Sequence, residues 1–296
     1  MDVATAEIQR IADRYLRSEA SASMVMMELV QLTEDTYALA RALPALEGEP
    51  ARLRELAQHL AENEAGCRTI VKMIRQRLDS PEPADGADDG IERCRKLFDA
   101  SVAESEESSV ALYSLGSPEL LAAATDEVVN VMEAWGVLGP QRDALEIGCG
   151  IGRLMVPLCA RLRSIVGTDV SPGMVAAATR RLEGCSNAGA QLTGGRDLSE
   201  FTSESMDLIF SVDAFPYLVL SGRALVERHF HEVRRVLGPA GDFVLFNYAY
   251  GRPREDVNAE VLSLAHSAGL QVLRADESPF RIWNGIGWLM RREKHR

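Results

Sequence analysis

The chain has 296 residues, of which 46% are hydrophobic and 26% are charged, and its formal net charge is -12 at pH 7. The length suits one large domain or two smaller ones. The acidic balance argues against a nucleic-acid surface, because phosphate binding needs clustered lysine and arginine side chains. No apolar stretch approaches the roughly 20 residues that cross a bilayer, and the N-terminus lacks the basic, then apolar pattern of an export signal. We therefore expect a cytoplasmic protein without a membrane span or a nucleic-acid partner.

Charge divides the chain into two regions. Residues 1–135 carry 26 acidic and 13 basic residues, whereas residues 136–296 carry 18 and 19. The five cysteines form no CxxC pair, so neither a disulfide framework nor a zinc ribbon is indicated, and a reducing cytoplasm fits. Two regions with different roles are expected.

The first region has the periodicity of helices. Apolar residues recur on one face over 8–16, 26–40 and 50–78, while residues 80–90 are rich in Pro, Gly and Asp and have no apolar anchor. We therefore predict a helical N-terminal region over 1–90 that ends in a mobile linker. It would act as a lid or as the contact surface of a homodimer.

Further helices are predicted before the pattern changes. One runs over 91–103, and another begins after Ser117, an N-cap followed by Pro118, and ends at Gly136. We therefore expect residues 91–296 to form one domain, with leading cap helices over 91–135 and an α/β core over 136–296.

Short apolar runs alternate with helical stretches in the second region, which predicts a mainly parallel sheet with helices on both faces. The expected strands are 144–147, 164–169, 190–194, 207–212, 242–247, 270–275 and 283–290. The expected helices are 153–162, 172–182, 223–237 and 254–268.

The most informative segment joins the first of these strands to a helix. Gly148, Gly150 and Gly152 allow a sharp turn and a close approach to a ligand, and the start of a helix offers free N–H donors. Asp169 ends the second strand, where a carboxylate can accept the hydroxyl groups of a ribose. A nicotinamide fingerprint would require glycine at the position of Arg153, so the spacing is GxGxG instead.

With Glu146 two residues before the first glycine, this segment resembles the nucleotide-binding signature of class I S-adenosylmethionine-dependent methyltransferases. The resemblance covers residues 143–247 clearly and extends loosely to 289. It implies a Rossmann-like seven-stranded sheet with an antiparallel last strand, and S-adenosyl-L-methionine as the cofactor.

The resemblance also implies roles for single residues. The glycine loop would contact the methionine part, Glu146 would brace that loop, Asp169 would hold the ribose, and Met174 and Asp197 would contact the adenine. Tyr113, from the segment before the core, is a further candidate to lie over the cofactor. The expected cofactor-binding residues are Tyr113, Glu146, Gly148, Cys149, Gly150, Gly152, Asp169, Val170, Met174, Arg196, Asp197 and Leu198.

Asp213 and Tyr217 follow the fourth strand, where the family places groups near the transferred methyl, and both are candidate catalytic residues. Asp213 could instead only close the strand with a turn. The Asn-Pro-Pro-Tyr tetrad of many enzymes that methylate amino groups of nucleic acids and proteins is absent from 213–217. We therefore expect methyl transfer to an O, N or C atom of a small-molecule acceptor.

Alternative interpretations remain for the chain and for single residues. A protein that binds the cofactor or a partner without turnover would need the same motif, and an NAD-dependent oxidoreductase is a further alternative. Cys149 is expected to be a small loop residue because no base adjoins it. His229 and His231 face different directions on a helix, so no metal site is expected.

Overall fold

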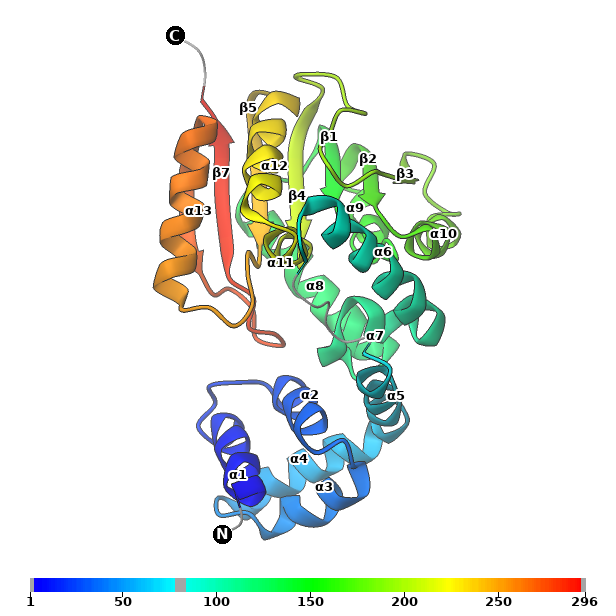
Figure 1. Ribbon diagram of the computed structural model, residues 1–296, viewed down its shortest axis with the longest axis vertical. Coiled ribbons are helices and arrows are strands. Elements are labelled where there is room, and N and C mark those ends of the chain that lie inside the picture. The colour runs from blue at the N-terminus through cyan, green and yellow to red at the C-terminus, as the bar shows by residue number, and fades with distance from the viewer. Residues whose placement is uncertain (1–2, 78–83, 294–296) are drawn as a thin grey trace. The chain divides into compact units, whose positions relative to one another are not determined.

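The structure, a computed structural model, describes residues 3–77 and 84–293 (Figure 1). Contacts between residues divide the chain into two compact units. The helical unit comprises the described residues of 1–80, 100–127 and 280–284. The sheet unit comprises the described residues of 81–99, 128–279 and 285–296. Each unit has an apolar core of its own.

Short helices form the helical unit. Leu29, Leu39, Leu56 and Ile70 come from four of these helices and are fully buried in its core. Two longer helices, α6 (Ala87–Glu104) and α8 (Pro118–Ala134), contribute residues to both units. The other elements are α1 (Val3–Leu16), α2 (Ala22–Thr33), α3 (Thr36–Ala42), η1 (Leu43–Ala45), α4 (Pro50–Glu62), α5 (Glu64–Arg75), α7 (Glu106–Val110) and η2 (Leu112–Ser114).

Two of the predicted long helices are wrong, because each is broken in two. Glu34 ends α2 in the left-handed conformation (φ 48°), and Asp35 then caps α3 by accepting the N–H groups of Tyr37 and Ala38, both at 3.0 Å. The stretch from residue 50 is likewise divided into α4 and α5 at Asn63, whose φ of -113° is not helical. Residue 78, the predicted end of that helix, lies outside the described residues.

The predicted linker over 80–90 is partly wrong. Residues 80–83 lie outside the described part of the chain, but residues 87–90 are the first turn of α6. Asp88 and Asp89 suit that position, because the N–H groups at a helix start carry partial positive charge. The helix expected at residue 91 therefore begins four residues earlier.

The sheet unit confirms the predicted seven-stranded, mainly parallel sheet. Its strand order is β3-β2-β1-β4-β5-β7-β6, and β7 runs antiparallel to both of its neighbours. The strands are β1 (Gly139–Ile147), β2 (Leu162–Asp169), β3 (Ala188–Leu192), β4 (Met206–Val212), β5 (Leu237–Phe246), β6 (Leu270–Glu277) and β7 (Gly287–Arg292). The predicted last strand thus lies four residues too early at its start.

Helices cover both faces of this sheet (Figure 1). Phe230 of α12 and Val261 of α13 are fully buried in one core with Leu145 of β1. On the opposite face Met155 of α9 lies against Gly167 of β2, and Trp135 contacts Phe246 at a ring distance of 5.2 Å. The helices after β1 are α9 (Met155–Cys159), α10 (Pro172–Arg181), α11 (Phe215–Leu220), α12 (Arg223–Val236) and α13 (Arg254–Ala268). The predicted helix over 153–162 is therefore much shorter than expected.

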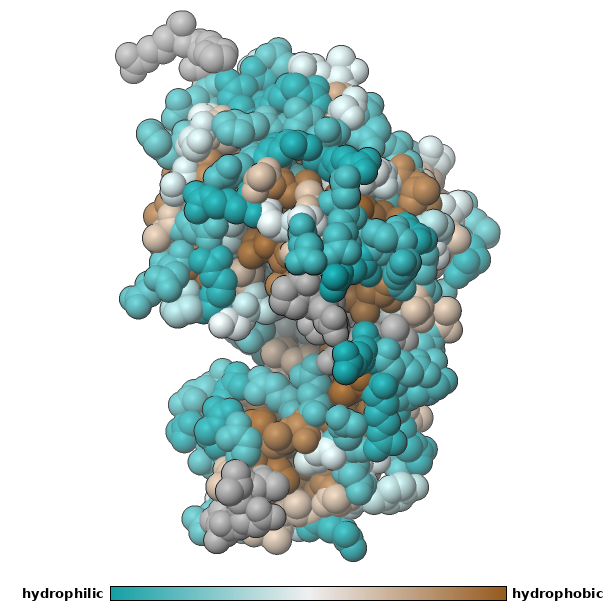
Figure 2. All heavy atoms as spheres, in the orientation of Figure 1, coloured by the Kyte–Doolittle hydropathy of each residue, from teal (hydrophilic) through white to brown (hydrophobic). Residues whose placement is uncertain are grey.

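Polar side chains dominate the surface of the sheet unit on the face drawn in Figure 2. Among the described helices, none has the length and apolar character to cross a membrane.

Candidate functional site

The predicted glycine loop lies at the carboxyl end of β1, in the middle of the sheet unit. β1 pairs with β2 on one side and β4 on the other, so the order of the strands reverses at this point. Open parallel sheets bind ligands at such a reversal, outside the carboxyl ends of the strands. The loop therefore starts from the position where the fold most readily forms a binding site.

The backbone of this loop requires glycine. Gly148, Gly150 and Gly152 have φ values of 72°, 52° and 74°, which residues with a side chain rarely adopt. A Cβ atom on Gly148 would lie 2.3 Å from the Cβ atom of Ala214. The N–H groups of Gly148 and Cys149 both donate to the carbonyl oxygen of Thr168, at 2.8 and 2.9 Å. These contacts hold the loop against the end of β2.

Asp169 joins the loop to the next helix. Its Oδ2 accepts the N–H of Gly150 at 2.9 Å, and its Oδ1 accepts the N–H of Ser171 at 2.9 Å. The residue is only 9% exposed. Burial raises the pKa of the Asp169 carboxyl to about 6, although the backbone N–H donors oppose that rise. A buried carboxyl is thus fixed at the edge of the sheet where β2 ends.

The raised pKa of Asp169 predicts a pH-dependent stability. The folded state favours the neutral carboxyl, so its contribution is present near pH 4 and is lost as the pH rises through about 6. Between pH 4 and 7 the wild type should lose about 2 kcal/mol of unfolding free energy relative to Asp169→Asn. Urea unfolding of both proteins at pH 4 to 7 measures this difference. The Glu146 and Asp99 carboxyls adjoin this group and are common to both proteins. A difference that is constant with pH would contradict the prediction.

Glu146 is a buried acid with an unsatisfied oxygen. Its side chain is 2% exposed, and within the described residues its Oε2 has no hydrogen-bond partner. Burial raises the pKa of this carboxyl well above its ordinary value, and the charge of Arg153 opposes that rise. A buried acceptor without a donor is costly. This site is therefore suited to a ligand that brings a donor.

The predicted adenine-side residues lie on the neighbouring segments. Met174 is buried at the start of α10, and Leu198 is 2% exposed. The Ser199 hydroxyl, followed by the Ser199 N–H that donates to Oδ1 of Asp197 at 3.1 Å, lowers the pKa of the Asp197 carboxyl. Asp197 is thus ionised and held in a turn of its own segment.

Val170 and Arg196 connect the same area to α6. Gly195 adopts a φ of 70°, and a Cβ atom there would lie 2.6 Å from Cγ1 of Val170 and 3.3 Å from Cγ2 of Ile91. The Arg196 guanidinium pairs with Asp88 of α6 at 2.7 Å, on the surface. Arg196 is therefore paired with α6, and its role at the cofactor stays a prediction.

Sequence reasoning missed the contribution of α6 to this site. Oδ1 of Asp99 accepts the Ser171 hydroxyl at 2.6 Å and the N–H of Gly173 at 2.9 Å. Gly90 also sits tightly against α11, since a Cβ atom there would lie 2.2 Å from Oγ of Ser221. No sequence signal indicated these contacts, because the predicted helix begins at residue 91 and Gly90 lies in the predicted linker. Asp99 thereby fixes the start of α10, beside Asp169.

The ends of β4 and β5 carry a second cluster. Asp213 and Asn247 both adopt a φ of 60°, and Oδ1 of Asp213 accepts Nδ2 of Asn247 at 2.6 Å and the Tyr250 hydroxyl at 2.7 Å. Burial raises the pKa of the Asp213 carboxyl, while these two donors and the charge of Arg153 oppose the rise. Asn247 and Tyr250 therefore hold the carboxyl in place.

A chain of aromatic rings extends from Tyr250, which donates to this carboxyl. The Tyr217 ring meets Phe98 edge to face at 4.8 Å and Tyr250 at 6.5 Å between centroids. The predicted catalytic residues Asp213 and Tyr217 are thus linked through Tyr250. Phe98, on α6, is a member that no sequence motif indicated.

Tyr113 is the predicted cofactor residue that lies outside the sheet unit. Its ring belongs to the helical unit and stacks on Trp283 at 5.8 Å between centroids, with the planes 17° apart. A role for Tyr113 over the cofactor stays a prediction.

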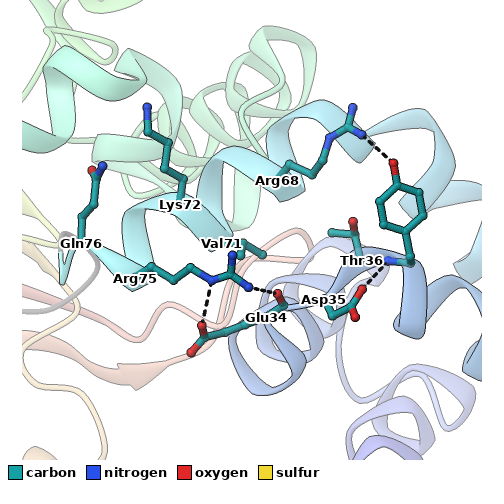
Figure 3. A pocket seen from close by; sticks show the side chains of 9 residues that line it. Glu34, Asp35, Thr36, Arg68, Val71, Lys72, Arg75 and Gln76 are labelled. Carbon is teal, nitrogen blue, oxygen red and sulfur yellow. Dashed lines mark hydrogen bonds and ion pairs between the residues drawn. The ribbon is translucent and has the colours of Figure 1, made fainter.

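A surface pocket of about 490 Å³ lies on the helical unit, between the start of α3 and α5 (Figure 3). Its basic side chains already have acidic partners, since Arg68 pairs with Glu64, Lys72 with Glu104 and Arg75 with Glu34. This pocket therefore offers no strong anion site.

No group of three or more His, Cys, Asp or Glu residues that could hold a metal ion occurs within residues 3–77 and 84–293. His229 is buried, and its Nδ1 hydrogen-bonds the carbonyl oxygen of Leu225 at 2.9 Å. Burial lowers the pKa of this histidine, so it is a neutral core residue.

Comparisons with known proteins match the sheet unit. Residues 145–245 match a family model described as "Methyltransferase domain". An uncharacterized methyltransferase of Schizosaccharomyces pombe is 34% identical over 125 residues, which cover 41% of this chain and 46% of that relative. The chain thus spans about half the length of the curated relative that it matches.

Solved structures share the fold. Phosphoethanolamine N-methyltransferase 1 of Haemonchus contortus, in complex with phosphoethanolamine and S-adenosylhomocysteine, is 14% identical with a TM-score of 0.55; 71% of this chain and 50% of that chain are covered. A SAM-dependent methyltransferase from Aquifex aeolicus is 21% identical with a TM-score of 0.47; the coverage is 59% and 93%.

Proposed function

We propose that this chain, whose residues 145–245 match a methyltransferase domain, is a class I S-adenosylmethionine-dependent methyltransferase that transfers a methyl group to a small-molecule acceptor. The observation that carries the proposal is the glycine loop at the sheet reversal, with Asp169 fixed beside it. An NAD site would use a similar loop and acid, but Arg153 stands where a nicotinamide fingerprint has glycine.

The residues at this edge fit the cofactor that the family uses. Glu146 offers a buried oxygen without a donor, which suits the ammonium of the methionine part. Asp169 offers carboxylate oxygens to ribose hydroxyls, and Met174 and Leu198 offer apolar contact to the adenine. When bound, S-adenosylmethionine supplies a methyl group that is already activated by a positively charged sulfur.

The main task of the protein is therefore to position the acceptor against this methyl group. Alignment of two reacting groups contributes up to about 7 to 11 kcal/mol, and a general base adds roughly 10² to 10⁴ in rate. Asp213 is the candidate base, because burial raises its pKa toward the range in which a carboxylate accepts a proton usefully. Tyr217 and Tyr250 would orient the acceptor beside it.

The helical unit lies outside the matched domain, which spans only residues 145–245. An addition of this size to a minimal methyltransferase domain supports a role in acceptor recognition, as a lid. A protein that holds the cofactor without turnover is the alternative from another class of function. The two are distinguished by whether S-adenosylhomocysteine accumulates in the presence of candidate acceptors.

Calorimetry tests the cofactor directly. We expect S-adenosylmethionine or its demethylated product to bind, and NAD not to bind. Asp169→Ala should weaken that binding by about 1 to 3 kcal/mol, because ribose hydroxyls lose their acceptor. Asp126→Ala, which removes an exposed carboxylate of the helical unit, is the matched control and should leave affinity unchanged. Tight NAD binding without binding of S-adenosylmethionine would contradict the proposal.

A further inference from the structure

Two of the five cysteines lie side by side in the sheet unit. Cys67, Cys94 and Cys149 are buried, whereas Cys159 and Cys185 are partly exposed. The Cys159 Sγ lies 3.1 Å from the carbonyl oxygen of Val156, and the Cys185 Sγ lies 4.0 Å from the same oxygen. The two thiols thus share one backbone acceptor, and the Cys185 side chain interacts directly with the Cys159 thiol.

The backbone around the two thiols is held by hydrogen bonds. Cys159 is the last residue of α9, and Cys185 lies in the turn between α10 and β3. Nδ2 of Asn187 donates to the carbonyl oxygens of Cys159 and Leu162, at 2.8 and 3.1 Å. The segment that carries Cys185 is therefore anchored directly to the residue that carries its neighbour.

We propose that Cys159 and Cys185 form a reversible disulfide, which is a modification site separate from the methyl-transfer site. A small disulfide, such as oxidised glutathione, is the oxidant. One protein thiolate attacks a sulfur of the reagent, its S–S bond breaks, and one thiol leaves. The second protein thiol then attacks the mixed disulfide, which releases the second small thiol and forms the Cys159–Cys185 bond. The protein loses two protons and two electrons, and the reagent becomes two thiols.

The ionisation of the Cys159 thiol determines the pH at which the disulfide forms. Burial and the adjoining Cys185 thiol raise the pKa of Cys159 to about 11, so this thiol is protonated near neutrality. Only the thiolate attacks a disulfide. Closure of the bond should therefore become faster as the pH rises from 7 to 9, by about tenfold per pH unit where attack by Cys159 is limiting. The charged groups nearest to the two cysteines in sequence are Arg161 and Glu183.

The position of the bond predicts its effect on the protein. α9 follows the glycine loop and α10 follows Asp169, so both helices begin at the cofactor edge, while the two thiols lie at or beyond their far ends. The bond would link the end of α9 to the turn after α10, and it would not contact the glycine loop. We therefore expect cofactor affinity to stay within about twofold, and the melting temperature to rise by roughly 5 to 10 °C because a long loop is closed.

The experiment treats the full chain with oxidised glutathione at pH 8.5, then denatures it and alkylates the remaining thiols. A protein that contains the disulfide carries three alkyl groups instead of five. Its mass is about 2 Da below that of a reduced protein with three alkyl groups, because two hydrogen atoms are lost. Peptide mapping should find Cys159 joined to Cys185, and a reductant should restore five alkylation sites. Calorimetry with S-adenosylmethionine gives the affinity before and after linking.

Three variants make the result specific. Cys159→Ser and Cys185→Ser should each stop the link and leave a single glutathione adduct on the other cysteine. Cys67→Ala removes a buried thiol of the helical unit and should link as the wild type does. Five alkylated cysteines after treatment, two persistent adducts on the wild type, or a link between another pair would each overturn the proposal. None of these outcomes bears on methyl transfer, which is tested by cofactor binding.

Discussion

Replacement of Asp213 by asparagine is expected to lower turnover by about 10² or more while S-adenosylmethionine affinity barely changes. Asparagine keeps an oxygen that can accept from Asn247 and Tyr250, so the geometry of the cluster is retained. It cannot take a proton from the acceptor, and loss of a general base costs roughly 10² to 10⁴ in rate. The measurement is release of S-adenosylhomocysteine with an acceptor that the wild type methylates, together with calorimetry of cofactor binding.

Tyr250→Phe is the control for this variant. It removes one of the two donors to the same carboxylate oxygen but leaves the carboxylate itself, so its effect should be milder. Tyr217→Phe, which keeps the ring against Phe98, should also be mild. If Asp213→Asn unfolds the protein or abolishes cofactor binding, the carboxylate is structural and catalysis depends on positioning alone. The cofactor assignment would survive that outcome.

Gly148→Ala is expected to lower the unfolding free energy by about 3 kcal/mol or more. Two costs combine, since the backbone has a φ of 72° and the new Cβ atom would lie 2.3 Å from that of Ala214. Urea unfolding at constant pH measures the loss. Cofactor affinity should fall as well, because relief of the contact must move the loop.

Two further variants separate the cost of the backbone strain from the cost of the close contact with Ala214. Gly184→Ala introduces the same methyl group where no atom lies within 4 Å and φ is not positive, so it should be nearly neutral. Ala214→Gly combined with Gly148→Ala removes the close contact but not the backbone strain, so it should recover part of the stability. Equal losses in Gly148→Ala and Gly184→Ala would show that the loop tolerates a side chain.

The sheet could be predicted from the sequence because its signals are local. The strand that precedes Gly148 and the acid that ends β2 are read from neighbouring residues, and the alternation of apolar runs and helices indicates parallel strands. The residues at which the helices begin and end were harder to predict from the sequence. Glu34 ends α2 in a conformation that favours glycine, and no sequence pattern indicates a left-handed glutamate. Asp88 and Asp89 resemble linker residues by composition, but they begin α6.

The residues of the candidate site also include some that the sequence indicated and some that it did not. Glu146 and Asp169 could be placed beside the glycine loop because their positions follow from their distance along the chain to that motif, and their roles toward the cofactor stay predictions. Asp99 and Tyr250 could not, because they reach Ser171 and Asp213 only through the packing of distant segments, 72 and 37 residues apart in sequence. Their side-chain types carry no motif. Periodicity and spacing therefore predict the cofactor edge better than the groups that complete it.

The left-handed backbone at Asp213 and Asn247 limits how the acceptor range of this protein could be redesigned. Asparagine and aspartate tolerate that conformation better than other residues with a side chain, so both positions accept few substitutions on backbone grounds alone. The rings of Phe98, Tyr217 and Tyr250 lie on ordinary backbone and carry no such restriction. A library aimed at new acceptors should therefore vary these three rings and keep the two polar residues fixed.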